Sequence, residues 1–459
     1  MASHVTQGIA QASNLWGKYL NCHYLWVPGW LNRMHRMGVY CMETQHSARG
    51  HRLHAGFAIL MCSLLLVLTG CAHLTYDSTV LPTPTVLKPS PTSLPARPKA
   101  DEIATESNIL RAQVAKVQKI MAGMSLDQKL GQLIIVEYIG NNYQDSNLQY
   151  MITQQFVGGF MYQASNHNFD PPYDTINLVD DFSRRAMRDA PIPLLIATDQ
   201  EGGEVNRLLT FHGYLPSAEE MAATGDPNVA LTQGSQTAEW MLQLGMNADL
   251  APVVDVQTVD PPVLVTRMFG RNPQTVAVYA GAFLSGLQKN GIIACLKHFP
   301  GLGAVTSDPH KSLPIVTRSL TDLEAIDLAA YKMMIQRYQP GMIMATDVLV
   351  PAIDPTLPAE VSPKAIDGIL RGQLGYDGVV MTDGLYMAGI SDKWTLSEAA
   401  VLSIIAGDDI IEGPASPGEV ASVVTAFKQA IRQGRLTIDR IDQSVQRILL
   451  MKLQYGIIK

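Results

Sequence analysis

The chain has few cysteines, few charges and no basic run in its body, and these shortages argue against several classes of protein. Four of its five cysteines lie within the first 71 of 459 residues, which argues against a disulfide framework or a cysteine-rich metal site. Charged residues make up 16% of the chain and the net charge is -7, so a nucleic-acid partner is not expected. Apolar residues make up 47%, which is enough to build a large buried core.

Residues 1–71 are typical of a signal region. The apolar run 55–68 follows Arg49 and Arg52, is short for a membrane span and suits the core of a signal peptide. It ends in Leu68-Thr69-Gly70-Cys71, which resembles a bacterial lipobox. We therefore expect lipidation of Cys71 and an extracytoplasmic protein attached to the cell membrane. A plain secretory signal and an uncleaved short anchor are the alternatives.

Two boundaries follow from composition. The stretch before Met37 is long for a signal, which makes Met34, Met37 and Met42 candidate starts. Residues 72–107 contain repeated proline, threonine and serine, a composition that stays extended and predicts a tether. Residues 108–459 are then expected to form a single catalytic domain.

Short β-branched runs alternate with amphipathic helical patterns from there to the end of the chain, and we expect Ser125 to cap a helix. Eight alternations predict an α/β fold, a (β/α)₈ TIM barrel, with a doubly wound open sheet as the alternative. The expected strands are Gln132–Val136, Gly158–Met161, Leu194–Thr198, Asn247–Val256, Ile292–Phe299, Gly341–Val348, Gly378–Leu385 and Asp408–Gly413.

Titratable side chains end six of these strands, and this favours the barrel because barrel enzymes build their sites at the carboxyl ends of their strands. They are Asp199, Asp255, Lys297 with His298, Asp347, Asp383 and Glu412. Asp255 and Glu412 have an equally good interpretation as acceptors of backbone hydrogen bonds, so neither is included among the predicted site residues.

The loop from Lys297 to Pro314 is rich in glycine and proline and carries Asp308 and His310, two positions apart. A carboxylate beside an imidazole orients the ring and stabilises its cation, which suits general acid and base chemistry near neutral pH. A solvated surface ion pair is the simpler interpretation of such a pair taken alone.

The ordered motifs resemble glycoside hydrolase family 3, in its branch of single-domain β-N-acetylglucosaminidases of the NagZ type. The resemblance covers about residues 125–458. The motifs that carry it are LIATDQEGG from Leu195, NADLAPV from Asn247, KHFPG from Lys297, LGYDGVVMTD from Leu374 and RIL from Arg447.

The resemblance implies a retaining exo-glycosidase that releases terminal β-linked N-acetylglucosamine by double displacement. It makes Asp383 the nucleophile, His310 the general acid and base, and Asp308 the residue that orients His310. It further implies sugar contacts from Asp199, Arg207, Arg267, Lys297, His298 and Met387.

The resemblance implies no cofactor and no metal. The expected partner is a carbohydrate, such as a peptidoglycan or chitin fragment, with a membrane anchor at the N-terminus and a monomeric state. Three other functions stay open: an N-acetylglucosaminide phosphorylase, a β-glucosidase of the same family, and a non-catalytic surface lipoprotein that binds sugar.

Several positions depart from the family pattern. Leu302 and Ala304 replace a histidine and an aspartate in the loop after the fifth strand, and Pro309 replaces a serine or threonine. Glu204 stands where an arginine is usual, and Asp347 where a histidine is usual. We interpret these changes as altered contacts around a working site.

Overall fold

The computed structural model describes residues 100–169, 174–260, 264–306 and 311–459, with side chains from residue 108 onward. The predicted signal region with Cys71 lies outside the described residues, as does most of the predicted tether. Asp308 and His310 also lie outside them.

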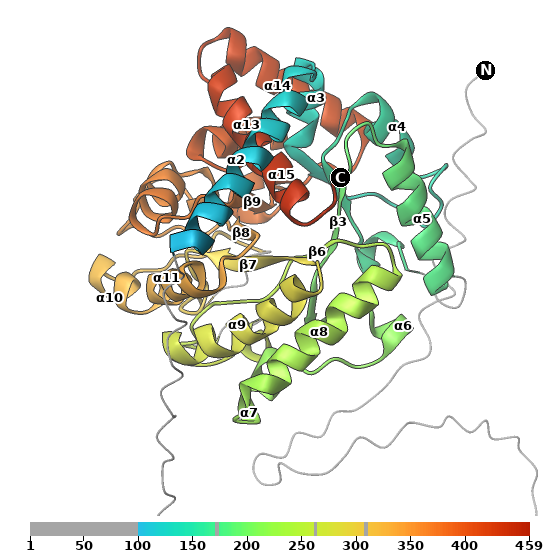
Figure 1. Cartoon of the computed structure of the whole chain (residues 1–459). Helices are drawn as coiled ribbons and strands as arrows, with labels where there is room; N and C mark the ends of the chain where they lie inside the picture. Colours follow the sequence, from blue (N-terminus) through green and yellow to red (C-terminus); the bar gives the residue numbers. More distant parts are fainter. Residues whose placement is uncertain (1–99, 170–173, 261–263, 307–310) are drawn as a thin grey trace, which may run out of the picture. The chain divides into compact units, whose positions relative to one another are not determined.

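In the described part of the chain, eight parallel strands close into a barrel, which confirms the predicted fold (Figure 1). The barrel closes where the first strand pairs with the last, with Ile134 opposite Ile411. In barrel order the strands are β1 (Ile134–Val136), β10 (Ile410–Glu412), β9 (Val379–Gly384), β8 (Met342–Ala345), β7 (Ile293–Phe299), β6 (Ala248–Asp249), β3 (Leu195–Thr198) and β2 (Gly159–Met161).

The strands are almost entirely buried, as expected for parallel strands covered by helices. The fourth predicted strand, Asn247–Val256, is much shorter than expected and leaves only β6. Pro252 has no N–H to give to a strand ladder, and a single bridge between Val253 and Lys297 continues the pairing. A small antiparallel hairpin, β4 (Gln200–Gly202) with β5 (Val205–Asn206), follows β3.

Helices surround the barrel. The α-helices are α2 (Ala100–Ala122), α3 (Leu126–Gln132), α4 (Leu148–Gln154), α5 (Ile176–Asp189), α6 (Leu209–His212), α7 (Ala218–Ala223), α8 (Pro227–Gln243), α9 (Pro273–Lys289), α10 (Leu320–Ala325), α11 (Asp327–Tyr338), α12 (Ala388–Ser391), α13 (Leu396–Ala406), α14 (Pro417–Arg432) and α15 (Ile438–Gln454). Short 3-10 helices are η1 (Ala164–Asn166), η2 (Val265–Arg267) and η3 (Ala359–Val361), and η4 (Lys364–Gln373) is a π-helix.

Capping residues set many helix starts. The predicted N-cap at Ser125 is confirmed: its side chain accepts from the backbone N–H of Gln128, and the Gln128 side chain accepts from the backbone N–H of Ser125. Ser217 and Glu220 make the same reciprocal pair at α7. Thr395 caps α13 with one hydrogen bond, which its side chain accepts from the backbone N–H of Glu398.

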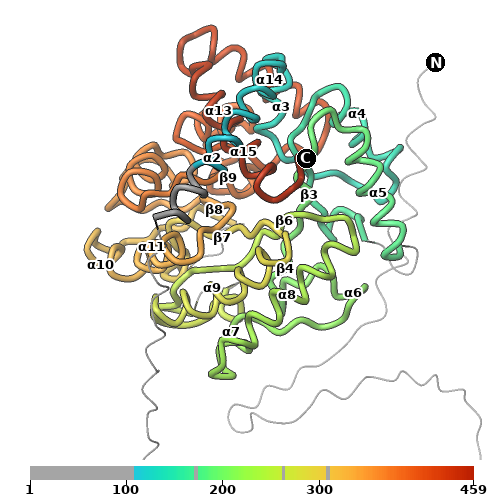
Figure 2. The backbone as a smooth tube through the Cα atoms, in the orientation of Figure 1, coloured from blue at the N-terminus to red at the C-terminus, as the bar shows by residue number. Residues whose placement is uncertain are grey.

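Helix α2 begins at Ala100, inside the segment 72–107 that was predicted to be a tether, so the structured part of the chain starts earlier than expected. Its acidic and apolar residues from 101 onward fit a helix better than a tether. Helix α2 packs against α15, so that the first and last described helices lie side by side (Figure 2). None of the described helices combines the length and apolar composition needed to cross a membrane.

The helices α8 and α9 form the closest helix pair of the outer layer because small residues face each other. A Cβ on Gly234 of α8 would lie 2.1 Å from the backbone oxygen of Phe283 on α9. The helical segment from Leu320 to Tyr338 is divided at Ile326 into α10 and α11. These helices hold the strands in register and so fix the positions of the side chains at the strand ends.

Candidate active site

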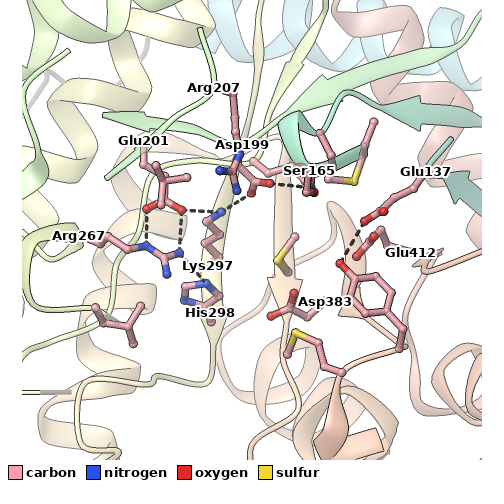
Figure 3. A pocket seen from close by; sticks show the side chains of 18 of the residues that line it. Glu137, Ser165, Asp199, Glu201, Arg207, Arg267, Lys297, His298, Asp383 and Glu412 are labelled. Carbon is pink, nitrogen blue, oxygen red and sulfur yellow. Dashed lines mark hydrogen bonds and ion pairs between the residues drawn. The ribbon is translucent and has the colours of Figure 1, made fainter. Parts of the chain in front are cut away.

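A pocket of about 390 Å³ lies at the carboxyl ends of the barrel strands, within the size range of small-molecule sites. Figure 3 shows side chains from opposite parts of the rim pointing into it. The described residues predicted to act in the site all line this pocket, namely Asp199, Arg207, Arg267, Lys297, His298, Asp383 and Met387.

One wall of the pocket is an ion-pair network that we call the paired wall, made of Asp199, Glu201, Arg267 and Lys297 (Figure 3). Lys297 Nζ lies 2.5 Å from Asp199 Oδ1 and 2.7 Å from Glu201 Oε1. Arg267 holds Glu201 with two hydrogen bonds, of 2.7 Å to Oε2 and 2.8 Å to Oε1. The wall therefore pairs two cations with two carboxylates in a largely buried place.

The pairing decides the ionisation of these groups. Burial opposes the charge of Glu201, but the Arg267 and Lys297 cations hold the pKa of its carboxyl well below its usual range. Burial likewise opposes the charge of Lys297, but Asp199 and Glu201 raise the pKa of its ammonium above the usual range. All four groups are charged at neutral pH and keep hydrogen-bonding capacity toward the pocket.

His298 is held in one orientation by Asp255. Its Nδ1 lies 2.7 Å from Asp255 Oδ2, and its Nε2 lies 3.4 Å from Arg267 Nη2. Asp255 Oδ1 also accepts from the backbone N–H of His298 at 3.3 Å and of Leu302 at 2.8 Å. The interpretation of Asp255 as an acceptor of backbone hydrogen bonds is confirmed, and the carboxylate fixes the imidazole as well.

Two neighbouring side chains complete this part of the pocket. Gln163 Nε2 donates to Asp199 Oδ2 at 3.2 Å, so both oxygens of that carboxylate are engaged. The Arg207 cation, like that of Lys297, helps to lower the pKa of Asp199 against the effect of burial. The buried Nε of Arg207 has no hydrogen-bond partner among the residues that the structure describes.

Asp383 lies across the pocket, near the end of β9. Thr346 Oγ1 donates to its Oδ2 at 2.7 Å, and the backbone N–H of Gly384 donates to its Oδ1 at 2.9 Å. Its own backbone N–H donates to Glu360 Oε2 at 3.1 Å. Both oxygens are therefore oriented by donors, an arrangement that suits a carboxylate reacting at one defined point.

Two further buried carboxyl groups lie behind Asp383, and Asp347 is one of them. Burial and the Asp383 charge raise the pKa of Asp347 to about 8. Burial, followed by Asp347 and Asp383, also raises the pKa of Glu360. Both groups are fully buried and each has one oxygen without a hydrogen-bond partner among the described residues. Both shifts favour the protonated, uncharged form of the carboxyl group.

A second group of carboxyls, Glu137 and Glu412, lies beside Asp383, and we call these three the carboxyl wall (Figure 3). Tyr386 Oη donates to Glu137 Oε1 at 3.0 Å, and Asn166 Nδ2 donates to Glu137 Oε2 at 2.6 Å. Glu412 is 3% exposed, and burial, Glu137 and Asp383 raise its pKa. Glu412 thus lines the pocket, which is one of the two interpretations that the sequence left open for it.

The predicted pair Asp308 and His310 lies outside the described residues, but the start of its loop is well defined. Leu302 is buried against the pocket and gives its N–H to Asp255. A Cβ on Gly303 would lie 1.9 Å from the backbone oxygen of Val256, so only glycine fits there. Over the residues that the structure describes, no three His, Cys, Asp or Glu side chains gather in a way that could hold a metal ion.

Several pocket residues were not predicted. Glu137 directly follows β1, so the rule applied to six other strand ends would also have found it. Glu201 follows Asp199 by two positions and belongs to the same motif. Tyr386 and Glu360 carry no local signal, because only the fold brings them to Glu137 and Asp383.

Comparison with known proteins shows which family and which relatives this chain resembles. Residues 125–451 match the glycosyl hydrolase family 3 N terminal domain. The beta-hexosaminidase LpqI of Mycobacterium tuberculosis is 34% identical over 344 residues, which cover 72% of this chain and 84% of that protein. A beta-hexosaminidase of Nitrosomonas eutropha is 33% identical over 303 residues, which cover 64% of this chain and 85% of that protein.

A solved structure has the same barrel. The family 3 beta-N-acetylglucosaminidase from Paenibacillus sp. superimposes with a TM-score of 0.69 at 33% sequence identity. The match covers 73% of this chain and 63% of that one.

Proposed function

Because this chain belongs to glycosyl hydrolase family 3, we propose that it is a retaining β-N-acetylhexosaminidase that releases terminal β-linked N-acetylglucosamine. The names of its relatives support this proposal. The single observation that carries it is the placement of Asp383 in a pocket across from a paired wall of hydrogen-bonding side chains.

In the proposed mechanism Asp383 is the nucleophile. Cleavage of a glycosidic bond develops positive charge at the anomeric carbon, and a carboxylate stabilises that charge and traps the sugar as a covalent ester. Donation from Thr346 and from the Gly384 backbone aims the two oxygens. Water then displaces the ester, and two displacements retain the configuration.

The leaving oxygen needs a proton, for which we propose His310, with Asp308 as the group that orients it. The imidazolium delivers the proton in the first step, and the neutral imidazole removes one from water in the second. A neighbouring carboxylate stabilises the imidazolium, which is present before the first step and again after the second. This assignment is supported by the family resemblance and by the start of the loop at the end of β7, the strand that carries Lys297 and His298.

We propose that the paired wall binds the hydroxyl groups of the sugar. Lys297, Asp199 and Arg267 keep each other charged, so they offer donors and acceptors in fixed places before the ligand arrives. Arg207 and His298 extend the same surface, and Met387 lines the pocket next to Tyr386.

A panel of aryl β-glycosides tests the function. We expect the N-acetylglucosaminide to be cleaved with a kcat/KM well above that of the glucoside and the xyloside. A preference for the glucoside would contradict the proposal. Faster turnover with added phosphate, together with a sugar 1-phosphate as product, would replace it by a phosphorylase. Sugar binding without turnover in any assay would replace it by a sugar-binding lipoprotein.

We also propose that the protein is a monomeric lipoprotein outside the cytoplasmic membrane, acting on peptidoglycan or chitin fragments. The string Leu68 to Cys71 after an apolar run supports this location. Metabolic labelling with a fatty-acid analogue should mark the wild-type protein and not Cys71→Ala. Equal labelling of both would contradict lipidation at Cys71.

A further inference from the structure

The carboxyl wall contains groups that the proposed mechanism does not use. Glu412 ends β10 and Glu137 follows β1, so the two side chains come from the pair of strands that closes the barrel. Both line the pocket beside Asp383 (Figure 3). In a pair with a purely structural role, every carboxyl oxygen would have a hydrogen-bond partner within the protein. In this pair one oxygen has none among the described residues.

The two carboxyls differ in their partners. Glu137 accepts one hydrogen bond on each oxygen, from Tyr386 and from Asn166. Glu412 Oε1 is buried and has no partner among the described residues. A buried polar atom without a hydrogen-bond partner destabilises the protein, so a ligand group that satisfies it in the pocket is stabilised there.

The surroundings of Glu412 indicate which kind of ligand group satisfies its Oε1. Burial raises the pKa of Glu412, and the nearby Glu137 and Asp383 raise it further. The Glu412 side chain hydrogen-bonds to Glu137, and its unpartnered Oε1 is left as an acceptor. The ligand group that matches it is an O–H or N–H donor.

We propose that Glu412 is a further sugar-binding residue, whose Oε1 accepts a hydrogen bond from a donor next to the anomeric carbon, and that Glu137 positions it. The proposal rests on the proposed function in one respect, namely that the pocket holds a sugar. The donors near the anomeric carbon, where Asp383 reacts, are the N–H of the 2-acetamido group and the 6-hydroxyl. The substrate class is therefore an uncharged sugar that carries such a donor.

Binding of a substrate analogue tests this without turnover. The probe is phenyl 1-thio-β-N-acetylglucosaminide, compared with its 6-deoxy analogue and with an analogue lacking the 2-substituent. We expect Glu412→Leu to weaken binding of the parent compound about tenfold, as loss of one hydrogen bond does. Glu412→Gln keeps an acceptor and should bind within about threefold of the wild type.

The analogues identify the donor. For the one that lacks the group bound by Glu412, Glu412→Leu and the wild type should bind equally, because the hydrogen bond is already missing. The matched control is Asp408→Asn, which removes another fully buried acid with unpartnered oxygens, at the opposite end of β10 and outside the pocket. Asp408→Asn should leave all three affinities unchanged.

Two results would overturn the proposal: wild-type affinity in Glu412→Leu, or an equal loss for all three compounds, which would indicate a structural effect. Should Glu412→Leu not fold, Glu412→Met, with a side chain of similar length, takes its place. A wild type that binds the thioglycoside and cleaves no aryl glycoside refutes the hydrolase function alone, and the variants still decide the role of Glu412. A wild type that binds none of the compounds refutes the role of Glu412.

Discussion

The two walls of the pocket solve the problem of buried charge in opposite ways. In the paired wall, Lys297 and Arg267 neutralise Asp199 and Glu201 through direct ion pairs. In the carboxyl wall, Asp383, Glu412 and Glu137 lie together, and no lysine or arginine of the described residues forms a hydrogen bond or ion pair with them. One wall balances charge with charge. In the other, burial and the neighbouring carboxyl groups raise the pKa of Glu412 and so favour its uncharged form.

This difference determines which part of the pocket is sensitive to pH. Fixed ion pairs with strongly shifted pKa values keep the same charge over a wide pH range, so the paired wall keeps its shape. Carboxyls whose pKa values are raised toward neutrality, such as Asp347 behind Asp383, change charge within the range in which enzymes work. Substitutions in the two walls should therefore differ in kind.

The largest expected effect comes from Asp383→Ala in the carboxyl wall. Without the nucleophile, kcat/KM for an aryl β-N-acetylglucosaminide should fall on the order of 10⁴-fold, because no covalent intermediate can form. Initial-rate kinetics measure this, and binding of the thioglycoside serves as the control for an intact pocket. Full turnover in this variant would disprove the assignment of Asp383.

The second effect tests the paired wall. Lys297→Ala leaves Asp199 and Glu201 buried with one cation fewer, and should lower the free energy of unfolding by about 3–5 kcal/mol. Urea denaturation measures this change. The matched control is Lys332→Ala, an exposed lysine on α11, with an expected change within about 0.5 kcal/mol. Equal effects of the two substitutions would mean that the wall is not held by its ion pairs.

The third effect is a pH dependence confined to the carboxyls behind Asp383. Asp347 has a folded pKa of about 8, raised by burial and by Asp383, against an ordinary value near 4. Between those values the unfolded chain has lost the proton that the folded chain keeps, so wild-type stability falls as pH rises, by up to about 1.4 kcal/mol per pH unit.

Asp347→Asn removes this titration. The free energy of unfolding of the variant relative to the wild type should therefore increase from pH 4 to pH 8 and level off above it. Denaturation at a series of pH values measures the difference. Parallel profiles would show that the pKa of Asp347 is not raised in the folded protein, and so that the carboxyls behind Asp383 are no more sensitive to pH than the paired wall.

The smallest effect sets a baseline outside both walls. Ser125→Ala removes the reciprocal cap at the start of α3 and should cost about 1 kcal/mol of stability, with no change in kcat or KM. Thermal unfolding together with kinetics checks both statements. An altered KM would show that the scaffold and the pocket are coupled more tightly than their separation suggests.

Much of the fold follows from sequence because periodicity and strand-end chemistry are local signals. Eight buried β-branched runs predicted the barrel, and the structure confirms it. The failures are local as well. Asn247–Val256 was predicted as a long strand from its composition, but Pro252 interrupts the ladder. Residues 100–107 were assigned to the tether because proline and serine precede them, and they begin α2.

The pocket was predicted unevenly for a physical reason. Lys297, Asp199 and Arg267 belong to motifs that resemble a known family, and they line the pocket together. Glu412 was recognised as a strand end but not included, because sequence alone does not tell a backbone acceptor from a pocket residue. Tyr386 could not be found, because its role depends on a hydrogen bond to a residue 249 positions away.

That sequence separation also orders the events of folding. The ion pair between Lys297 and Asp199 joins residues 98 positions apart, within the span from β3 to β7. The carboxyl wall joins the first strand to the last, so Glu137 meets Glu412 only when β10 closes the barrel. During synthesis all residues of the paired wall are therefore made before Asp383 and Glu412 of the carboxyl wall. The pocket is completed by β10, the last strand to be made.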